Sequence, residues 1–244
     1  MYRALRAEKI VSTVKALQAR IASRFPGSGL AKVCNDLIGV AEQTSARVAD
    51  VDKPHWGIRL SLAIAVGAGL AGLISLVAYG VALKGTDELT EILQGLDSAV
   101  NLLVIIGGAI FFLSTLETRW KRARALKALH ELRAIVHVID MHQLTKDPSM
   151  LGQARMSNSP DRELSPFELM RYLDYCSEML SLTAKLAALY AERLSDAVVV
   201  DTVGDIERLT SDLSNKIWQK ITMVQGLEGR DLPLPGPQFM KPSA

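Results

Sequence analysis

Three of the four histidines lie within 13 positions of one another, at His130, His137 and His142, and Asp140 stands among them. Imidazole and carboxylate groups bind transition metals and carry protons. His130 and His137 are seven residues apart, so on a helix they share a face but lie about 10 Å apart along the axis. One metal ion would therefore need ligands from another helix. The alternative interpretation is that these side chains make ordinary polar contacts inside a helical bundle.

A second set of residues follows helical spacing inside an apolar stretch. Asp97, Asn101, Gly108 and Thr115 lie at intervals of four, seven and seven, which places them in one stripe along a helix. In a ring of subunits this stripe would line a path for cations. The alternative is packing, in which Asn101 bonds to a neighbouring helix. The pore hypothesis requires an oligomer, because two spans cannot enclose a path alone.

Other catalytic motifs are missing from the sequence. It contains no phosphate-binding loop, nucleophile elbow or His-Glu-x-x-His zinc motif. Gly67, Gly69 and Gly72 have dinucleotide-binding spacing, but they lie in an apolar run with no preceding strand. Cys34 and Cys176 have no metal-like spacing, and we interpret both as reduced packing residues. We therefore predict a protein that is not an enzyme and needs no cofactor. A membrane-tethered, metal-dependent enzyme using the histidines is a third alternative.

Two apolar runs dominate the middle of the chain. Residues 60–83 contain no charged side chain, and 24 residues of helix span about 36 Å. Residues 99–116 are also uncharged and span about 27 Å. Since the hydrocarbon core of a bilayer is about 30 Å thick, we expect two transmembrane helices. Ala65, Gly69 and Gly72 would let the first approach its neighbour closely.

The charges flanking these runs predict the orientation. The connection 84–98 carries four acids and one base, whereas basic residues follow the second run. By the positive-inside rule, both termini lie in the cytoplasm and the acidic connection lies outside. We expect the plasma (inner) membrane; a basic, acid-poor start makes the mitochondrial inner membrane the alternative. Interfacial aromatic residues would be Trp56 and Trp120 inside and Tyr79 outside.

Helical periodicity organises the rest of the chain. Residues 1–57 predict a cytoplasmic helical hairpin, with an apolar seam at Ile10, Val14, Leu17 and Ile21 and a possible cap at Ser28. Residues 58–118 form the transmembrane hairpin, and 119–147 continue its second helix. A polar loop at 148–164, a helical pair at 165–228 and a proline-rich tail at 229–244 follow.

The helical pair has the strongest local signals. Ser165 and Glu168 form a capping box around Pro166, and either Ser195 or Thr202 would cap the second helix. Heptad spacing predicts that the first helix packs against another helix. Its interaction seam comprises Leu169, Leu173, Cys176, Leu180, Thr183, Ala187, Tyr190 and Leu194.

These patterns predict an all-α membrane protein, in which a transmembrane hairpin carries a cytoplasmic bundle of N- and C-terminal helices. The net charge of +2 gives no support for nucleic-acid binding. We expect a scaffold, regulatory or assembly role, with the lipid bilayer, further copies of the chain and a cytoplasmic protein as partners. The alternative is an oligomeric ion channel or membrane-permeabilising effector whose second span lines the path.

Overall fold

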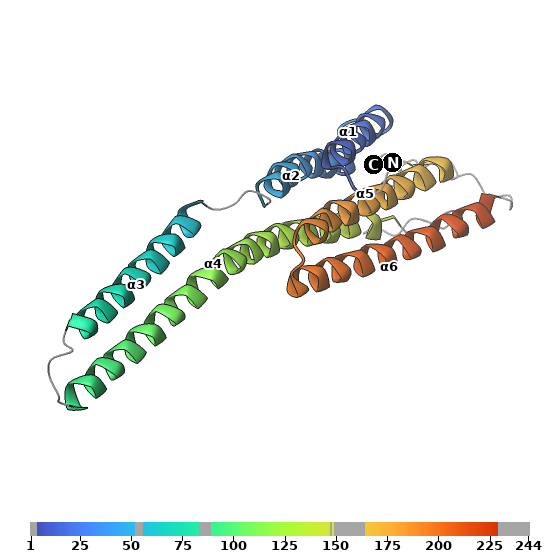
Figure 1. Cartoon of the computed structure of the whole chain (residues 1–244). Helices are drawn as coiled ribbons and strands as arrows, with labels where there is room; N and C mark the ends of the chain where they lie inside the picture. The colour runs from blue at the N-terminus through green and yellow to red at the C-terminus, as the bar shows by residue number, and fades with distance from the viewer. Residues whose placement is uncertain (1–3, 52–55, 83–88, 147, 149–163, 229–244) are drawn as a thin grey trace, which may run out of the picture. The chain divides into compact units, whose positions relative to one another are not determined.

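The computed structural model describes residues 4–51, 56–82, 89–146, 148 and 164–228 (Figure 1). Every regular element in these residues is a helix, which confirms the predicted all-α class. The helices are α1 (Ala7–Arg24), α2 (Gly29–Val51), α3 (Trp56–Ala82), α4 (Leu89–Leu144), α5 (Pro166–Arg193) and α6 (Ala197–Glu228).

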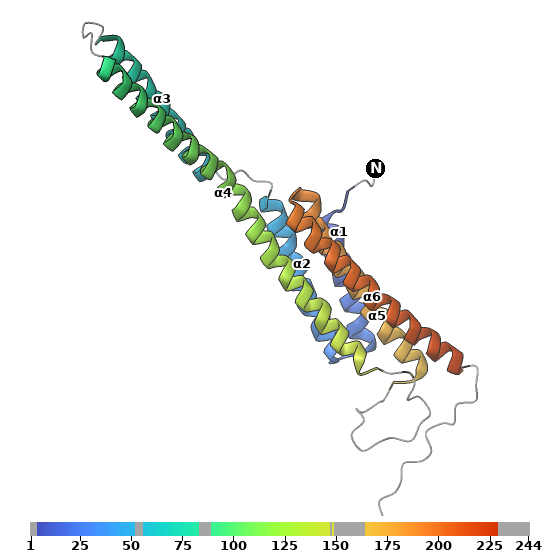
Figure 2. The ribbon, with the colours of Figure 1, turned by 90° about the horizontal axis from the view of Figure 1, so that it is seen from below.

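The helices divide between two compact units. Unit 1 comprises Met1–Asp50 and Ala125–Ala244, and unit 2 comprises Val51–Arg124. In unit 1, α1, α2, α5, α6 and the C-terminal part of α4 lie side by side in both ribbon views (Figures 1 and 2). The predicted helical bundle of N- and C-terminal segments is thus present.

Helix α5 lies at the centre of unit 1. It packs against α6 and α1, and it buries side chains well beyond one heptad seam, including Tyr172, Met179 and Leu186. Helix α1 buries the four seam residues that its periodicity predicts. Apolar side chains of α2 and α4, such as Leu37 and Leu132, complete the core. An apolar interior of this kind supplies most of the stability of a helical bundle.

Local chemistry defines the ends of these helices. Gly27 has φ +71°, a conformation that glycine adopts without strain, and the next residue, Ser28, accepts a hydrogen bond from the Ala31 amide at 3.2 Å. The Ser165–Glu168 capping box is complete at the start of α5. The predicted cap of α6 is wrong. Neither serine nor threonine caps it; the Asp196 carboxylate accepts bonds from the first-turn amides at 3.1 and 3.3 Å.

Unit 2 is a pair of apolar helices, α3 and the first part of α4, which lie side by side (Figures 1 and 2). Helix α4 begins at Leu89, so the connection is shorter than the predicted 84–98 because Ile92, Leu93 and Leu96 continue the helical period. Within the described residues, one helix, over Leu103–Leu144, has the length and composition needed to cross a membrane; Ala63–Gly72 is a shorter apolar segment. The side chain of Tyr79, most of the loop 148–164 and the tail 229–244 lie outside the described residues.

Candidate functional site

The histidine cluster of α4 does not converge in the structure. His130 and His137 are exposed, whereas the His142 ring lies against the backbone of Gly29, its Cε1 atom 2.5 Å from the position of a Cβ atom there. The Asp140 carboxylate accepts a hydrogen bond from Gln143 Nε2 at 2.6 Å. Across the described ranges, no three His, Cys, Asp or Glu side chains are grouped so that they could hold a metal ion.

The polar stripe lies on the outside of unit 2. Asp97, Asn101 and Gly108 are exposed, and Thr115 is half-buried and donates its hydroxyl to the Phe112 carbonyl at 2.9 Å. At about 100° per residue, these positions fall within about 40° of one another around α4. The stripe is therefore one continuous face of the helix.

The small residues of α3 lie where α3 packs against α4. Gly69 is buried, and Ala65 and Gly72 are half-buried. A Cβ atom at Gly69 would lie 2.8 Å from Cδ1 of Ile106 in α4, so only glycine permits this approach. Ile106 lies about half a turn around α4 from the polar stripe. Helix α3 therefore leaves the stripe uncovered.

The predicted interaction seam is enclosed by the chain's own helices. Leu169, Leu173, Cys176, Leu180, Thr183, Ala187 and Tyr190 are buried, and Leu194 packs against the same core. A partner of this protein would therefore contact other surfaces of unit 1. The two cysteines are free and buried, and burial raises the pKa of each thiol to about 12.

A polar cluster inside unit 1 was missed by the sequence analysis. Arg47 of α2 donates to Glu131 of α4 at 2.6 Å, and both side chains are partly buried. Next to them lie the buried hydroxyls of Thr44 and Tyr190, for which the described residues provide no partner with hydrogen-bond geometry. The pKa of Tyr190 lies above its usual value, because the effect of burial outweighs the lowering by the neighbouring Thr44 and Arg47. These residues come from three helices, and no local motif links them.

A second interhelical contact also lacks a sequence signal. Lys220 of α6 donates to the Gln143 carbonyl at 3.0 Å and to the Gln143 side-chain oxygen at 2.7 Å. Gln143 lies in the last turn of α4 and is buried. The Gln143 carbonyl also accepts the Lys146 amide at 3.1 Å. The ammonium group is therefore a second donor to a carbonyl in the last turn of α4, and it complements the negative end of the helix dipole.

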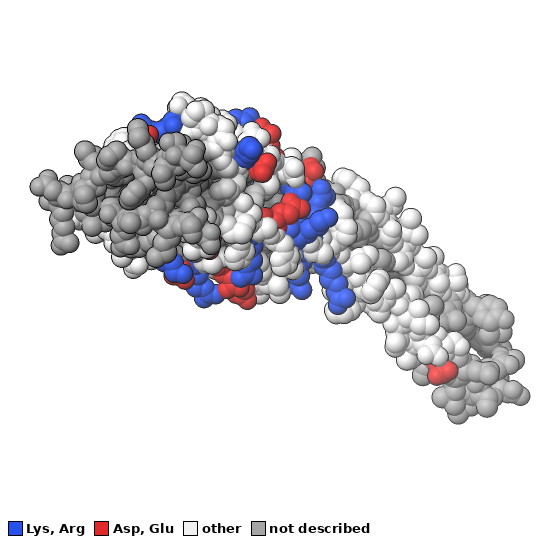
Figure 3. Space-filling view, turned by 180° about the vertical axis from the view of Figure 1, so that it is seen from behind, with Lys and Arg blue, Asp and Glu red and all other residues white. Residues whose placement is uncertain are grey.

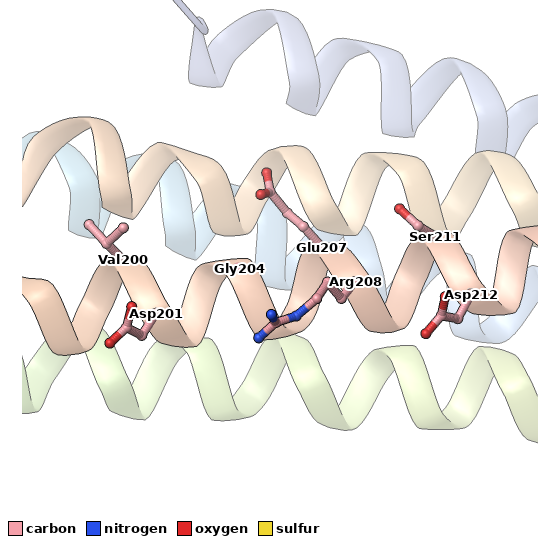
Figure 4. A pocket seen from close by; sticks show the side chains of 7 residues that line it. All are labelled: Val200, Asp201, Gly204, Glu207, Arg208, Ser211 and Asp212. Atoms are coloured by element: carbon pink, nitrogen blue, oxygen red, sulfur yellow. The ribbon is translucent and has the colours of Figure 1, made fainter.

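The outer face of α6 carries an open depression of about 600 Å³ (Figure 4). All its lining residues belong to this helix, among them Val200, Gly204 and Ser211, with Asp201, Glu207 and Asp212 beside them. Arg208 is paired with Asp205. This is a shallow acidic strip on one helix, without the converging polar groups of an active site.

Comparison with protein-family models, curated proteins and solved structures finds no match for this chain.

Proposed function

We propose that this chain is an integral membrane protein in which unit 2 is a two-span hairpin and unit 1 is a helical interaction domain in the cytoplasm. Its role is that of a scaffold, regulator or assembly factor rather than an enzyme. The observation that carries the proposal is the contrast in apolar exposure between the two units.

Unit 2 exposes large apolar side chains that a water-soluble protein would bury. Ile74 is 67% exposed, Ile105 68% and Phe111 71%. Apart from the charged residues that follow Leu116 in α4, the described part of unit 2 has a surface with almost no charge in Figure 3. In unit 1, by contrast, most apolar side chains form a buried core and charged residues are distributed over the outside (Figure 3), although apolar side chains such as Trp218 and Phe167 are exposed there. A helix that is apolar all round, with no protein covering it, is the form expected in lipid.

The distribution of basic residues supports cytoplasmic termini. Helix α4 carries Arg119, Lys121, Arg122 and Arg124 after its uncharged run, and such residues are retained on the cytoplasmic side. We therefore place the α3–α4 connection outside, and the plasma (inner) membrane is the proposed location. The mitochondrial inner membrane, with unit 1 in the matrix, is the alternative.

Cysteine accessibility in intact cells tests this topology. In a Cys34→Ala/Cys176→Ala background, Thr86→Cys introduces a thiol in the α3–α4 connection and Ser12→Cys introduces one on the exposed side of α1. A membrane-impermeant maleimide should label position 86 in intact cells and position 12 only after permeabilisation. Equal labelling of both positions, or release of the protein by alkaline carbonate without detergent, would contradict the proposal.

The uncovered polar stripe favours a second candidate function, an oligomeric ion channel or membrane-permeabilising effector. An exposed asparagine in a spanning helix is costly unless another helix bonds to it, and α3 lies on the other side of α4. A further copy of the chain would supply such a helix.

The mass of the protein in nanodiscs, against 26.6 kDa per chain, separates the two functions. A closed ring of four or more copies, with Asn101→Leu changing conductance but not mass, would favour the channel. A monomer or dimer would exclude a central pore and leave the hairpin as an anchor.

A further inference from the structure

The uncharged run of α4 ends at Leu116, and several cations and an aromatic ring lie within about two turns after it. Arg119 and Arg124 are exposed, and Trp120 is 47% exposed. Arg124 Cζ lies 5.4 Å from the centre of the Trp120 ring, within the range of a cation–π contact. We define Arg119, Trp120 and Arg124 as the α4 collar.

Arg119 of the collar lies away from the nearest acid in the sequence, Glu117. Glu117 pairs with Lys121 at 2.8 Å. At about 100° per residue, this pair lies on the opposite side of the helix from Arg119 and on the same side as Arg124. Arg119 makes no ion pair within the residues that the structure describes. Figure 3 shows basic side chains grouped at one end of the uncharged surface.

Helix geometry brings the three groups of the collar to one level. Arg119 and Trp120 lie about 5 and 6 Å beyond Leu116, where the uncharged run ends. Arg124 starts one turn later, but side chains on a helix lean toward its N-terminus, and the stacking contact returns its guanidinium to Trp120. The headgroup layer of a bilayer is about 5–7 Å deep on each side. The collar therefore lies at the level of the lipid phosphates if unit 2 spans the bilayer.

We propose that the α4 collar is a binding site for the headgroups of anionic phospholipids. This inference rests on the proposed membrane insertion of unit 2 and adds the class of lipid that the protein selects. Guanidinium groups bind phosphate oxygens in pairs and stay charged at the surface, and tryptophan fixes the depth of the helix in the interfacial layer. Each cation near an anionic surface strengthens attraction about fivefold.

The test uses Trp120 itself as the reporter in the full-length chain. Trp56→Phe and Trp218→Phe leave it as the sole tryptophan. The protein is reconstituted into vesicles of phosphatidylcholine and phosphatidylglycerol at equal mole fractions, with only one of the two brominated on its acyl chains. Brominated phosphatidylglycerol should quench Trp120 more strongly, with a relative association constant at least about fivefold higher than that of phosphatidylcholine.

Variants of Arg119 assign the preference to the collar. Arg119→Gln should lower the relative association constant about fivefold, and Arg119→Lys, which keeps the charge, should retain most of it. Lys216→Gln removes one exposed charge from α6 and is the matched control, which should leave the preference unchanged.

The outcomes separate this inference from the proposed function. Equal quenching by both brominated lipids would overturn the lipid preference while supporting membrane insertion. Loss of quenching by both lipids would overturn the membrane proposal itself. Suppression of the preference by inorganic phosphate, at an ionic strength matched with chloride, would overturn the lipid assignment in favour of a site for free phosphate.

Discussion

Replacement of Leu173 by alanine tests whether α5 is the centre of unit 1. Leu173 is fully buried, as is Cys176 less than one turn further along the helix. Truncation of a buried leucine removes its transfer free energy and leaves a cavity, which together cost about 2–5 kcal/mol. Leu173 is one of many buried side chains in a common core, so the loss should appear as easier opening of the bundle rather than as a new fold.

Cys176 provides the assay, because its thiol reports on that opening. Burial raises its pKa to about 12, so at pH 8 only about one thiol in ten thousand is ionised, against about a quarter of ordinary thiols. The side chain is also inaccessible to a reagent. In a Cys34→Ala chain, a maleimide should therefore modify Cys176 only in molecules whose bundle has opened.

The free energy of the cavity converts directly into a labelling rate. When closing is faster than modification, a loss of 2–5 kcal/mol increases the rate about 30- to 5000-fold. Leu144→Ala is the control, because Leu144 is 61% exposed and a surface substitution should change the rate no more than about twofold.

Two results would refute this reasoning. The first is modification of Cys176 in the unsubstituted helix at the rate of an ordinary thiol. The second is a Leu173→Ala chain that is labelled no faster than the Leu144→Ala chain. Either result would mean that α5 is not enclosed by the other helices of unit 1.

Three further predictions follow from local contacts. Because the pKa values of Cys34 and Cys176 rise from about 9 to about 12 on folding, the unfolded chain loses these protons first. Stability should therefore fall between about pH 9 and 12, and urea unfolding of the double Cys→Ala chain should show a shallower fall. Gly69→Val should force α3 away from Ile106 and lower the thermal midpoint in detergent; adding Ile106→Ala should restore part of the loss, and a midpoint unchanged by Gly69→Val would contradict the contact. Ser165→Ala removes the cap of α5 and should cost about 1 kcal/mol in urea unfolding; Ser195→Ala, outside any cap, is its control.

Most of the confirmed fold predictions depend on residues that are close together in the sequence. The α1 seam and the Ser165 capping box follow from helix geometry over a few residues, so a single sequence suffices to find them. The wrong cap at the start of α6 is also a local error. Asp196 is next to Ser195 in the sequence, and aspartate caps a helix as well as serine does.

Contacts between distant residues could not be found in this way. Arg47 and Glu131 are 84 positions apart, and Lys220 and Gln143 are 77 apart. Each pair depends on how two helices are rotated and aligned, which hydrophobic periodicity predicts only to within a face of the helix. For the histidines of α4, residues close in sequence were candidates for one site. Their spacing could not reveal that His130 and His137 would be exposed.

The division of unit 1 between Met1–Asp50 and Ala125–Ala244 affects how the protein is made. Helix α1 leaves the ribosome with its apolar seam uncovered, and the helix that covers it, α5, ends at Arg193, roughly 170 residues after α1 ends. At about 5–20 residues per second, that interval lasts about 10–30 s. All of unit 2 is synthesised during this interval. The contact between α1 and α5 that closes unit 1 can therefore form only after all of unit 2 has been synthesised.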